Sequence, residues 1–322
     1  MILAGYIGGT NARLGLFEPV RPRPRQLAIQ AFTTLDFPDL PSMIAAFLEA
    51  GSIDRATIDR ASVSVAGPVV DDAATLTHVP WRVEGHEVAK AFGLKRVRVL
   101  NDLVAMAYAI PVLEDSELHT LQRGEPIRGG NITLMAAGTG LGIALLHNVD
   151  GRLVPSPSEG GHADFAARTE REIALLRDLT ARFGRAEVEQ VVAGKGLVNI
   201  HRFAHRGPCA AAVDLDDVDA PAEISKAALE RRCGGCVEVL EFFVESYGAE
   251  AGNLALGMMA TGGVYIGGGI APKILPALET GAFLKAFRTK SSFESMLEKI
   301  PIKVILNAEA GLLGAAVFGA DM

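Results

Sequence analysis

Three glycine-rich turns in the sequence carry the residue types that hold phosphate groups. The turns are Gly8-Gly9-Thr10, the segment GTGLG at 138–142 and Gly267-Gly268-Gly269, and each follows an apolar stretch. Glycine lets the backbone approach a phosphate closely and turn its N–H groups toward it, while threonine adds a hydroxyl donor. The sequence holds neither a P-loop with its lysine nor a strict Gly-x-Gly-x-x-Gly that opens a helix. Because many strands end in glycine, each turn alone is weak evidence for a phosphate site.

The pair Asn101-Asp102 stands where an alternating apolar segment, residues 96–100, gives way to a helical one. Asp102 fits two roles at that place. As an N-cap, it would accept hydrogen bonds from the first turn of the helix. As a carboxylate at the end of a strand, it would take a proton from a hydroxyl nucleophile. The residues themselves leave both interpretations open.

Glu159 and His162 are separated only by two glycines, in the segment SEGGH at 158–162. No apolar periodicity surrounds them, so the pattern does not predict a buried structural pair. Carboxylate and imidazole groups suit the paired recognition of neighbouring hydroxyls on a sugar. Glu189 lies in a helix-like segment, where a surface charge is the simpler interpretation.

The composition sets the class of protein that these residues belong to. The chain has 322 residues, of which 49% are apolar and 21% charged, which predicts a sizeable core in one large or about two domains. The net charge of −7 argues against nucleic acid or an anionic membrane as a partner. We expect the basic run at 21–25 to be a solvated loop, and the uncharged stretch 254–271 to be a helix end followed by a buried strand rather than a membrane span.

The N-terminus shows no signal-peptide pattern, and the three cysteines cannot all pair. Both observations predict a reduced, cytoplasmic protein. Cys233 and Cys236 form one Cys-x-x-Cys motif, without a second pair or a suitably spaced histidine. The spacing therefore predicts no four-ligand zinc site, and no metal-ligating residue is predicted in the chain.

Two segments, residues 2–17 and 132–146, predict a strand, a Gly-Thr turn and a second strand. They lie roughly 130 residues apart, which indicates duplicated α/β halves. Further strands are expected at 62–66, 96–100, 263–270 and 303–306. Helices are expected at 41–50, 103–109, 186–194, 224–248, 252–260 and 311–320.

Taken together, these motifs resemble the bacterial glucokinases of the hexokinase-like, actin-fold ATPase superfamily, from residue 2 to about residue 318. The pieces that carry the resemblance are GGTNARL at 8–14, LND at 100–102, AGTGLG at 137–142, SEGGHADFA at 158–166, GKGLVNIHR at 194–202 and GGVYIGGGIAPK at 262–273. The resemblance implies an α/β, two-domain actin-like (duplicated ribonuclease H-like) fold with an interdomain cleft. It implies a small domain of residues 1–110 plus 308–322 and a large domain of residues 111–307, with sugar and ATP meeting between them.

The resemblance also implies roles for single residues. Asp102 would be the general base for the 6-hydroxyl of glucose. The other sugar hydroxyls would be bound by Asn101, Glu159, His162 and Glu189. The ATP phosphates would be held at Gly5, Tyr6, Ile7, Gly8, Gly9, Thr10, Gly138 and Thr139, and the adenosine would lie near Gly268. The implied partners are glucose, ATP with Mg²⁺, and a second copy of the chain in a homodimer.

Tyr6 departs from the family pattern, because the family has an aspartate at this position that helps to orient the hydrated magnesium. Tyrosine is neutral at pH 7 and far bulkier. The loss of an outer-shell metal partner typically costs about 10- to 100-fold in affinity or activity. One hypothesis is a glucokinase that Tyr6 impairs, and the other is a catalytically weakened sugar-binding protein that acts as a sensor. The residues leave open an error in the sequence at this position, the choice among glucose, mannose and fructose, and the choice among ATP, ADP and polyphosphate.

Overall fold

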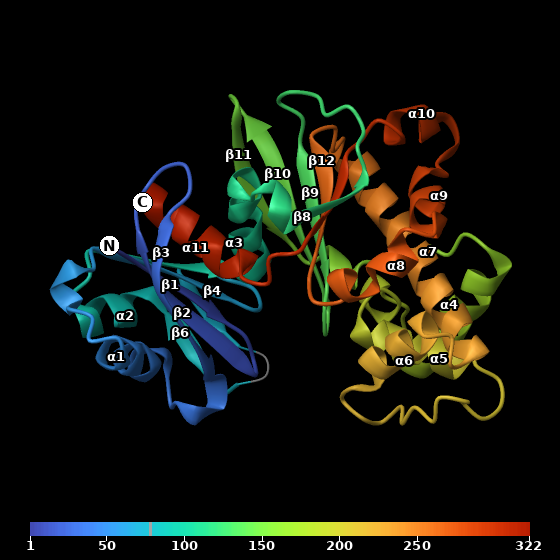
Figure 1. Cartoon of the computed structure of the whole chain (residues 1–322), viewed down its shortest axis with the longest axis horizontal. Helices are drawn as coiled ribbons and strands as arrows, with labels where there is room; N and C mark the ends of the chain where they lie inside the picture. Colours follow the sequence, from blue (N-terminus) through green and yellow to red (C-terminus); the bar gives the residue numbers. More distant parts are fainter. Residues whose placement is uncertain (77–78) are drawn as a thin grey trace. The chain divides into compact units, whose positions relative to one another are not determined.

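The computed structural model describes residues 1–76 and 79–322, which divide into two compact units (Figure 1). The first unit holds residues 1–114 and 307–322, and the second holds residues 115–306. Each unit is built on its own mixed β-sheet with helices packed against it. None of the helices in the described residues is both long enough and apolar enough to cross a membrane.

The first unit contains a five-stranded sheet in the order β3-β2-β1-β4-β7. The strands are β1 (Ile2–Ile7), β2 (Asn11–Glu18), β3 (Arg25–Thr33), β4 (Arg60–Val65) and β7 (Arg96–Asn101). Strand β1 pairs antiparallel with β2 and parallel with β4, and β4 pairs parallel with β7. A separate small ribbon joins β5 (Ala73–Thr75) and β6 (Arg82–Glu84). The carboxyl ends of β1 and β7 therefore lie at the same edge of the sheet.

The alternating pattern of β1 divides the core of this unit into two layers. Leu3 and Ile7 pack in one cluster with residues of α1 (Leu40–Ala50) and α2 (Gly85–Phe92). Ile2 and Ala4 face the other way, into a cluster with residues of α3 (Asp102–Ala109) and α11 (Ala310–Asp321). These two helices lie together in Figure 1. Position 6 continues the second series, so its side chain faces α3 and α11.

The second unit contains a six-stranded sheet in the order β11-β10-β9-β12-β13-β8. The strands are β8 (Leu118–Gln122), β9 (Ile132–Ala137), β10 (Leu141–Val149), β11 (Arg152–Ser158), β12 (Gly263–Gly267) and β13 (Ile302–Ile305). The helices are α4 (Glu170–Phe183), α5 (Gly194–Ala204), α6 (Ala220–Leu229), α7 (Gly234–Met258), α8 (Leu275–Leu278), α9 (Ala282–Arg288) and α10 (Glu294–Leu297). The long helix α7 packs on the sheet through Phe243 and Tyr247.

The first five strands of the second sheet repeat the order of the first sheet. In each unit an antiparallel hairpin is followed by a parallel neighbour of its first strand: β1–β2 with β4, and β9–β10 with β12. The strand-turn-strand segments predicted at 2–17 and 132–146 are confirmed as these two hairpins. The shared topology supports the expectation of duplicated α/β halves.

Three predicted helices differ from the structure. Residues 186–194 hold only a short 3₁₀ turn, Val188–Gln190, and the helix begins at Gly194 instead. The predicted break near residue 250 is absent, because Gly252 lies inside the continuous helix α7. A Cβ at Gly252 would come within 2.5 Å of the Phe287 carbonyl oxygen, so this glycine permits a close approach of α9 rather than ending a helix. The actual break lies at residues 230–233, between α6 and α7.

Helix α11 lies so close to α3 that a Cβ at Gly314 would overlap the backbone carbonyl of Ala105. We expect Gly314→Ala to lower the free energy of unfolding by about 1–3 kcal/mol through overpacking. Gly257, in the helix α7, is the matched control, because a Cβ there would meet no atom within 4 Å. Gly257→Ala should raise stability by about 0.5–1 kcal/mol. Urea unfolding followed by circular dichroism measures both, and equal effects of the two substitutions would contradict the packing argument.

Candidate active site

The turn between β1 and β2 is held in place by Thr34. The Gly8 N–H donates to the Asn11 carbonyl (3.0 Å), which closes the turn. The buried Thr34 donates its hydroxyl to the Gly8 carbonyl (2.8 Å) and its N–H to the Thr10 carbonyl (2.9 Å). These bonds fix the backbone of the turn, while Thr10 itself is exposed. A fixed turn with an exposed hydroxyl is the arrangement expected of a phosphate-binding hairpin.

The ring of Tyr6 lies between this turn and the start of α11. A Cβ on Gly8 would stand 3.8 Å from the Cε1 of Tyr6, and a Cβ on Gly311 would stand 2.9 Å from its Cδ2. Gly311 therefore makes room for the aromatic ring at the start of α11. Burial and, after it, the negative charge of Asp102 raise the pKa of Tyr6, so the phenol stays protonated at neutral pH.

The end of β7 places Asn101 and Asp102 in different roles. The Asn101 Oδ1 accepts hydrogen bonds from the N–H groups of Leu103 (3.0 Å) and Val104 (3.2 Å), and its Nδ2 donates to the Gly67 carbonyl (3.1 Å). Asn101 is therefore the N-cap of α3, and Asp102 is the first residue of the helix. The capping interpretation of Asp102 is wrong, because its neighbour fills that role. The Asp102 carboxylate accepts from the N–H of Leu103 (2.9 Å) at the positive end of the helix dipole.

In the second unit, the turn between β9 and β10 is joined to the start of α5. The Gly138 N–H donates to the Gly140 carbonyl, and the Gly194 N–H donates to the Gly138 carbonyl, both at 2.8 Å. Helix α5 begins without a side-chain cap. A helix start of this kind has backbone N–H groups suited to an anion.

A third glycine turn follows β12 and lies against the same strand end. Gly268 has a φ of +85°, and a Cβ there would overlap the backbone of Ala137. Only glycine satisfies both conditions, so the residue is required for the crossing of the two turns. The Ile270 N–H then donates to the Ala137 carbonyl (3.2 Å), which ties the segment after β12 to the end of β9.

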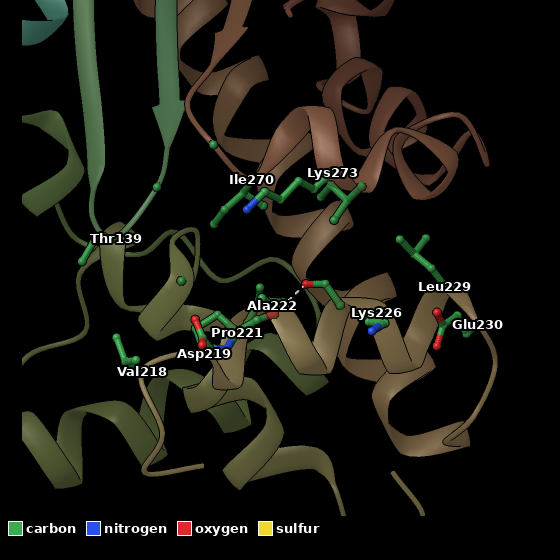
Figure 2. A pocket seen from close by; sticks show the side chains of 16 residues that line it. Thr139, Val218, Asp219, Pro221, Ala222, Lys226, Leu229, Glu230, Ile270 and Lys273 are labelled. Carbon is green, nitrogen blue, oxygen red and sulfur yellow. Dashed lines mark hydrogen bonds between the residues drawn. The ribbon is translucent and has the colours of Figure 1, made fainter. Parts of the chain in front are cut away.

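These turns form one end of a cavity of about 640 Å³ in the second unit. Figure 2 shows Thr139 at its edge, Ile270 and Lys273 on one side, and Pro221, Ala222 and Lys226 of α6 on the opposite side. The cavity falls in the range of volumes that hold small organic ligands and cofactors. Its apolar walls and glycine-rich end suit a flat ring system that carries phosphates.

A second group of polar residues gathers at the other predicted sugar-binding positions. The Nδ1 of His162 lies 2.9 Å from the Oε2 of Glu187. The hydrogen bond to Glu187 raises the pKa of His162 against the opposing effect of burial, and the charges of Glu189 and Glu159 add to the rise. His162 and Glu159 thus lie near one another, as the spacing of the two residues predicts.

Glu189 belongs to the same group and is held from two sides. Its carboxylate accepts a hydrogen bond from the Leu141 N–H (2.7 Å) and pairs with Lys195. Burial alone would raise the pKa of Glu189, but these two partners outweigh it and hold the pKa below its usual range. The simple surface-charge interpretation of Glu189 therefore does not describe a half-buried, bound carboxylate.

The structure brings together most, but not all, of the predicted residues within each unit. Gly8, Gly9, Thr10, Tyr6, Asn101 and Asp102 lie at one sheet edge of the first unit. Ile7 is fully buried, and Gly5 is buried in β1 between β2 and β4, so neither residue lies at the surface where a ligand would bind. Gly138 and Thr139 line the cavity of the second unit. After β12, the residue that lines the cavity is Gly269 and not the predicted Gly268.

Sequence reasoning missed two parts of the site. Glu187, the partner of His162, stands 25 residues away in the chain and has no local pattern. Helix α6 supplies one side of the cavity, although its sequence reads as an ordinary amphipathic helix. In both cases the signal lies in tertiary contact rather than in residue spacing.

The chain is similar to known proteins over its whole length. A family model described as Glucokinase matches residues 3–322. The chain belongs to the glucokinase family. A protein named glucokinase from Nostoc punctiforme is 38% identical to it over 341 residues, covering 100% of this chain and 99% of that protein. The predicted family is thereby confirmed.

Solved structures of the glucokinase family share the fold. The crystal structure of a glucokinase from an Antarctic psychrotroph superimposes with a TM-score of 0.87 at 30% identity, covering 100% of this chain and 99% of that chain. A ROK family glucokinase from Streptomyces griseus, solved in complex with glucose and AMPPNP, gives 0.67 at 21% identity, covering 100% and 99%. These structures confirm the predicted α/β, actin-like fold class.

We expect Glu187→Gln to lower the pKa of His162, because the substitution removes the partner that raises it. Histidine-ring NMR titration measures the pKa directly, and Glu49→Gln, a substitution in α1 of the first unit, is the control. A raised folded pKa adds stability that is present below the unfolded pKa of about 6.5 and is lost as pH rises through the folded pKa. Glu187→Gln should therefore lower the thermal midpoint more at pH 5.5 than at pH 9, and an unchanged His162 titration would contradict the assignment.

Proposed function

We propose that this chain catalyses the ATP-dependent phosphorylation of glucose at its 6-hydroxyl. The observation that carries the proposal is the second unit's cavity, which begins at two glycine turns and the start of α5 and continues between apolar walls. Membership of the glucokinase family supports the same reaction. The S. griseus structure holds both glucose and an ATP analogue, which supports ATP as the phosphoryl donor.

In this proposal Asp102 takes the proton of the 6-hydroxyl. Asn101 caps α3, and the start of the helix stabilises the negative charge of the Asp102 carboxylate, which accepts from the Leu103 N–H. The hydroxyl oxygen then attacks the γ-phosphorus of ATP, and the bond from that phosphorus to the β–γ bridging oxygen breaks, with ADP leaving. Asn101 contributes the second hydrogen of its Nδ2 to a sugar hydroxyl, since the first donates to Gly67.

Glu159, His162 and Glu189 bind the remaining hydroxyls. The partner Glu187 favours the charged form of His162, and the imidazole and the carboxylates supply donors and acceptors for the sugar hydroxyls. Hydrogen bonds to each hydroxyl exclude sugars that differ in configuration, because an unmatched buried polar group is costly. Membership of the glucokinase family supports glucose as the sugar that is accepted.

The nucleotide is placed in the cavity of the second unit. Its phosphates lie at Gly138 and Thr139 near the start of α5, and the adenosine lies between the segment after Gly268 and α6. The turn at Gly8–Thr10 contributes N–H groups and a hydroxyl to the transferred phosphate. Phosphoryl transfer requires chiefly this kind of positioning and charge neutralisation.

ATP enters the reaction as its magnesium complex, and position 6 does not fit that ion well. The phenol of Tyr6 is neutral and partly buried, and its pKa is raised, so it offers no negative charge to the hydrated metal. Its ring also lies beside the Gly8 turn. We infer that Tyr6 slows turnover without affecting the sugar site. A sugar sensor with little catalysis is the second candidate, and the same Tyr6 observation is what favours it.

We expect Asp102→Asn to reduce kcat by about 10²- to 10⁴-fold, the usual contribution of a general base. The affinity for glucose should stay within a few-fold, because asparagine keeps the shape and the hydrogen bond to Leu103 of the aspartate. A coupled assay of glucose 6-phosphate formation measures kcat, and calorimetry measures the affinity. If Asp102→Asn kept full activity, the assignment of the base would be wrong, and Asp39→Asn in the exposed cap of α1 is the control.

Tyr6→Asp should raise kcat/KM for magnesium–ATP by about 10- to 100-fold, since it restores a carboxylate toward the metal. Tyr6→Phe is the matched control, because it removes the hydroxyl and keeps the ring that lies between Gly8 and Gly311. The phenylalanine variant should behave like the natural chain. Equal turnover of the aspartate and tyrosine forms would show that position 6 does not limit the reaction.

A further inference from the structure

The second unit gathers three cysteines and two histidines at one place, away from the residues assigned to catalysis. His201 lies in the last turn of α5, His205 ends that helix, and Cys209 lies in the loop that follows. Cys233 is the N-cap of α7, and Cys236 lies in the first turn of the same helix. All three cysteines are free thiols.

The spacing between these side chains is that of a tetrahedral metal site. The Cys209 sulfur lies 3.8 Å from the Cys233 sulfur and 3.8 Å from the Cys236 sulfur. Four ligands around zinc, with zinc–sulfur bonds of about 2.3 Å, place their sulfurs about 3.8 Å apart. The Nε2 of His205 lies 3.1 Å from the Cys233 sulfur and completes a set of three thiols and one imidazole.

His201 gives a second, independent indication of a missing ligand. His201 is only 5% exposed, and its Nε2 is buried without a hydrogen-bond partner among the described residues. Its ring stacks on that of His205 at 4.4 Å. One ring nitrogen of each histidine lies within 4.8 Å of the Cys209 and Cys236 sulfurs. Because buried polar groups are normally satisfied, an orphan nitrogen beside thiols points to an ion.

The local backbone is arranged around the same point. A Cβ on Gly235 would overlap the His205 ring, so the glycine between the two cysteines of α7 admits the imidazole to the start of that helix.

We propose that the thiols of Cys209, Cys233 and Cys236 and the stacked imidazoles of His201 and His205 supply the four ligands of a structural site for Zn²⁺ or another thiophilic divalent cation. Four protein ligands leave no open position, which is the arrangement of a structural rather than a catalytic ion. The ion would join the end of α5, the 206–219 loop and the start of α7. That loop leads to Val218 and Asp219, which line the nucleotide cavity, so the ion would steady that wall. The proposal does not depend on the activity proposed above.

The cysteine spacing alone did not predict this site. His205 stands 28 residues before Cys233, and Cys209 stands 24 residues before it, so the ligands form no compact motif. The fold brings them together because α5 and α7 pack side by side.

The test is the zinc content of the purified, reduced full-length protein, measured by elemental mass spectrometry after dialysis against a weak chelator. We expect about one zinc per chain, and below about 0.1 per chain in Cys209→Ser and Cys233→Ser. Serine is a preferred N-cap, so Cys233→Ser preserves the start of α7. His86→Ala is the matched control, because His86 belongs to the other group of described residues close enough to hold a metal, the exposed Glu84, His86 and Glu87. It should leave the zinc content unchanged.

Cobalt substitution gives a second readout, which reports the type of ligand around the ion. The natural chain, supplied with Co²⁺ under reducing conditions, should develop the intense visible bands of tetrahedral thiolate coordination, and His86→Ala should show them equally. Cys209→Ser should lose or shift them. The proposal would be overturned if the reduced natural chain contained no zinc and developed no visible absorption bands with Co²⁺. So would a Cys209–Cys233 disulfide as the main form of the freshly purified protein, which would indicate a thiol pair instead.

Discussion

Close backbone approaches within each unit position the candidate residues of that unit. Gly268 crosses Ala137 where no side chain fits, and the crossing sets the end of β9 against the segment after β12. In the first unit, Gly314 brings α11 onto α3, which carries Asp102. A Cβ at either position would move a whole element, because packed interiors do not yield gradually. The side chains assigned to chemistry are short, so their reach depends on these backbone positions.

Much of this arrangement follows from local sequence, and the remainder depends on contacts between distant segments. The Gly-Thr hairpins and the strand that delivers Asn101-Asp102 are local patterns, so alternation and turn residues predict them. Residue type does not decide which of Asn101 and Asp102 caps α3, because both are good caps, and only the hydrogen bonds assign the role to Asn101. The partner of His162 and the wall formed by α6 could not be predicted, since neither has a spacing signal.

The predicted helix boundaries are wrong where a glycine permits close packing and does not end a helix. Gly252 lies inside α7, where the missing side chain lets α9 approach closely. In a sequence, a glycine at such a position instead predicts the end of a helix. The sequence did not predict the cluster of cysteines and histidines for a related reason. Its ligands come from α5, a loop and α7, and the distance in the chain hides a set that the fold makes compact. Position 6 differs from both cases: its residue type conflicts with the family pattern, and the structure accommodates the ring through Gly311.

The central claim is that ATP is consumed to phosphorylate the 6-hydroxyl of glucose. The most direct measurement is phosphorus NMR of the natural chain with ATP, magnesium and glucose, run beside an identical sample containing 6-deoxyglucose. We expect a growing phosphomonoester signal of glucose 6-phosphate that matches the ADP formed, and no sugar phosphate with 6-deoxyglucose. Release of inorganic phosphate with no sugar phosphate, or binding of glucose with no ATP consumed over a long incubation, would contradict it.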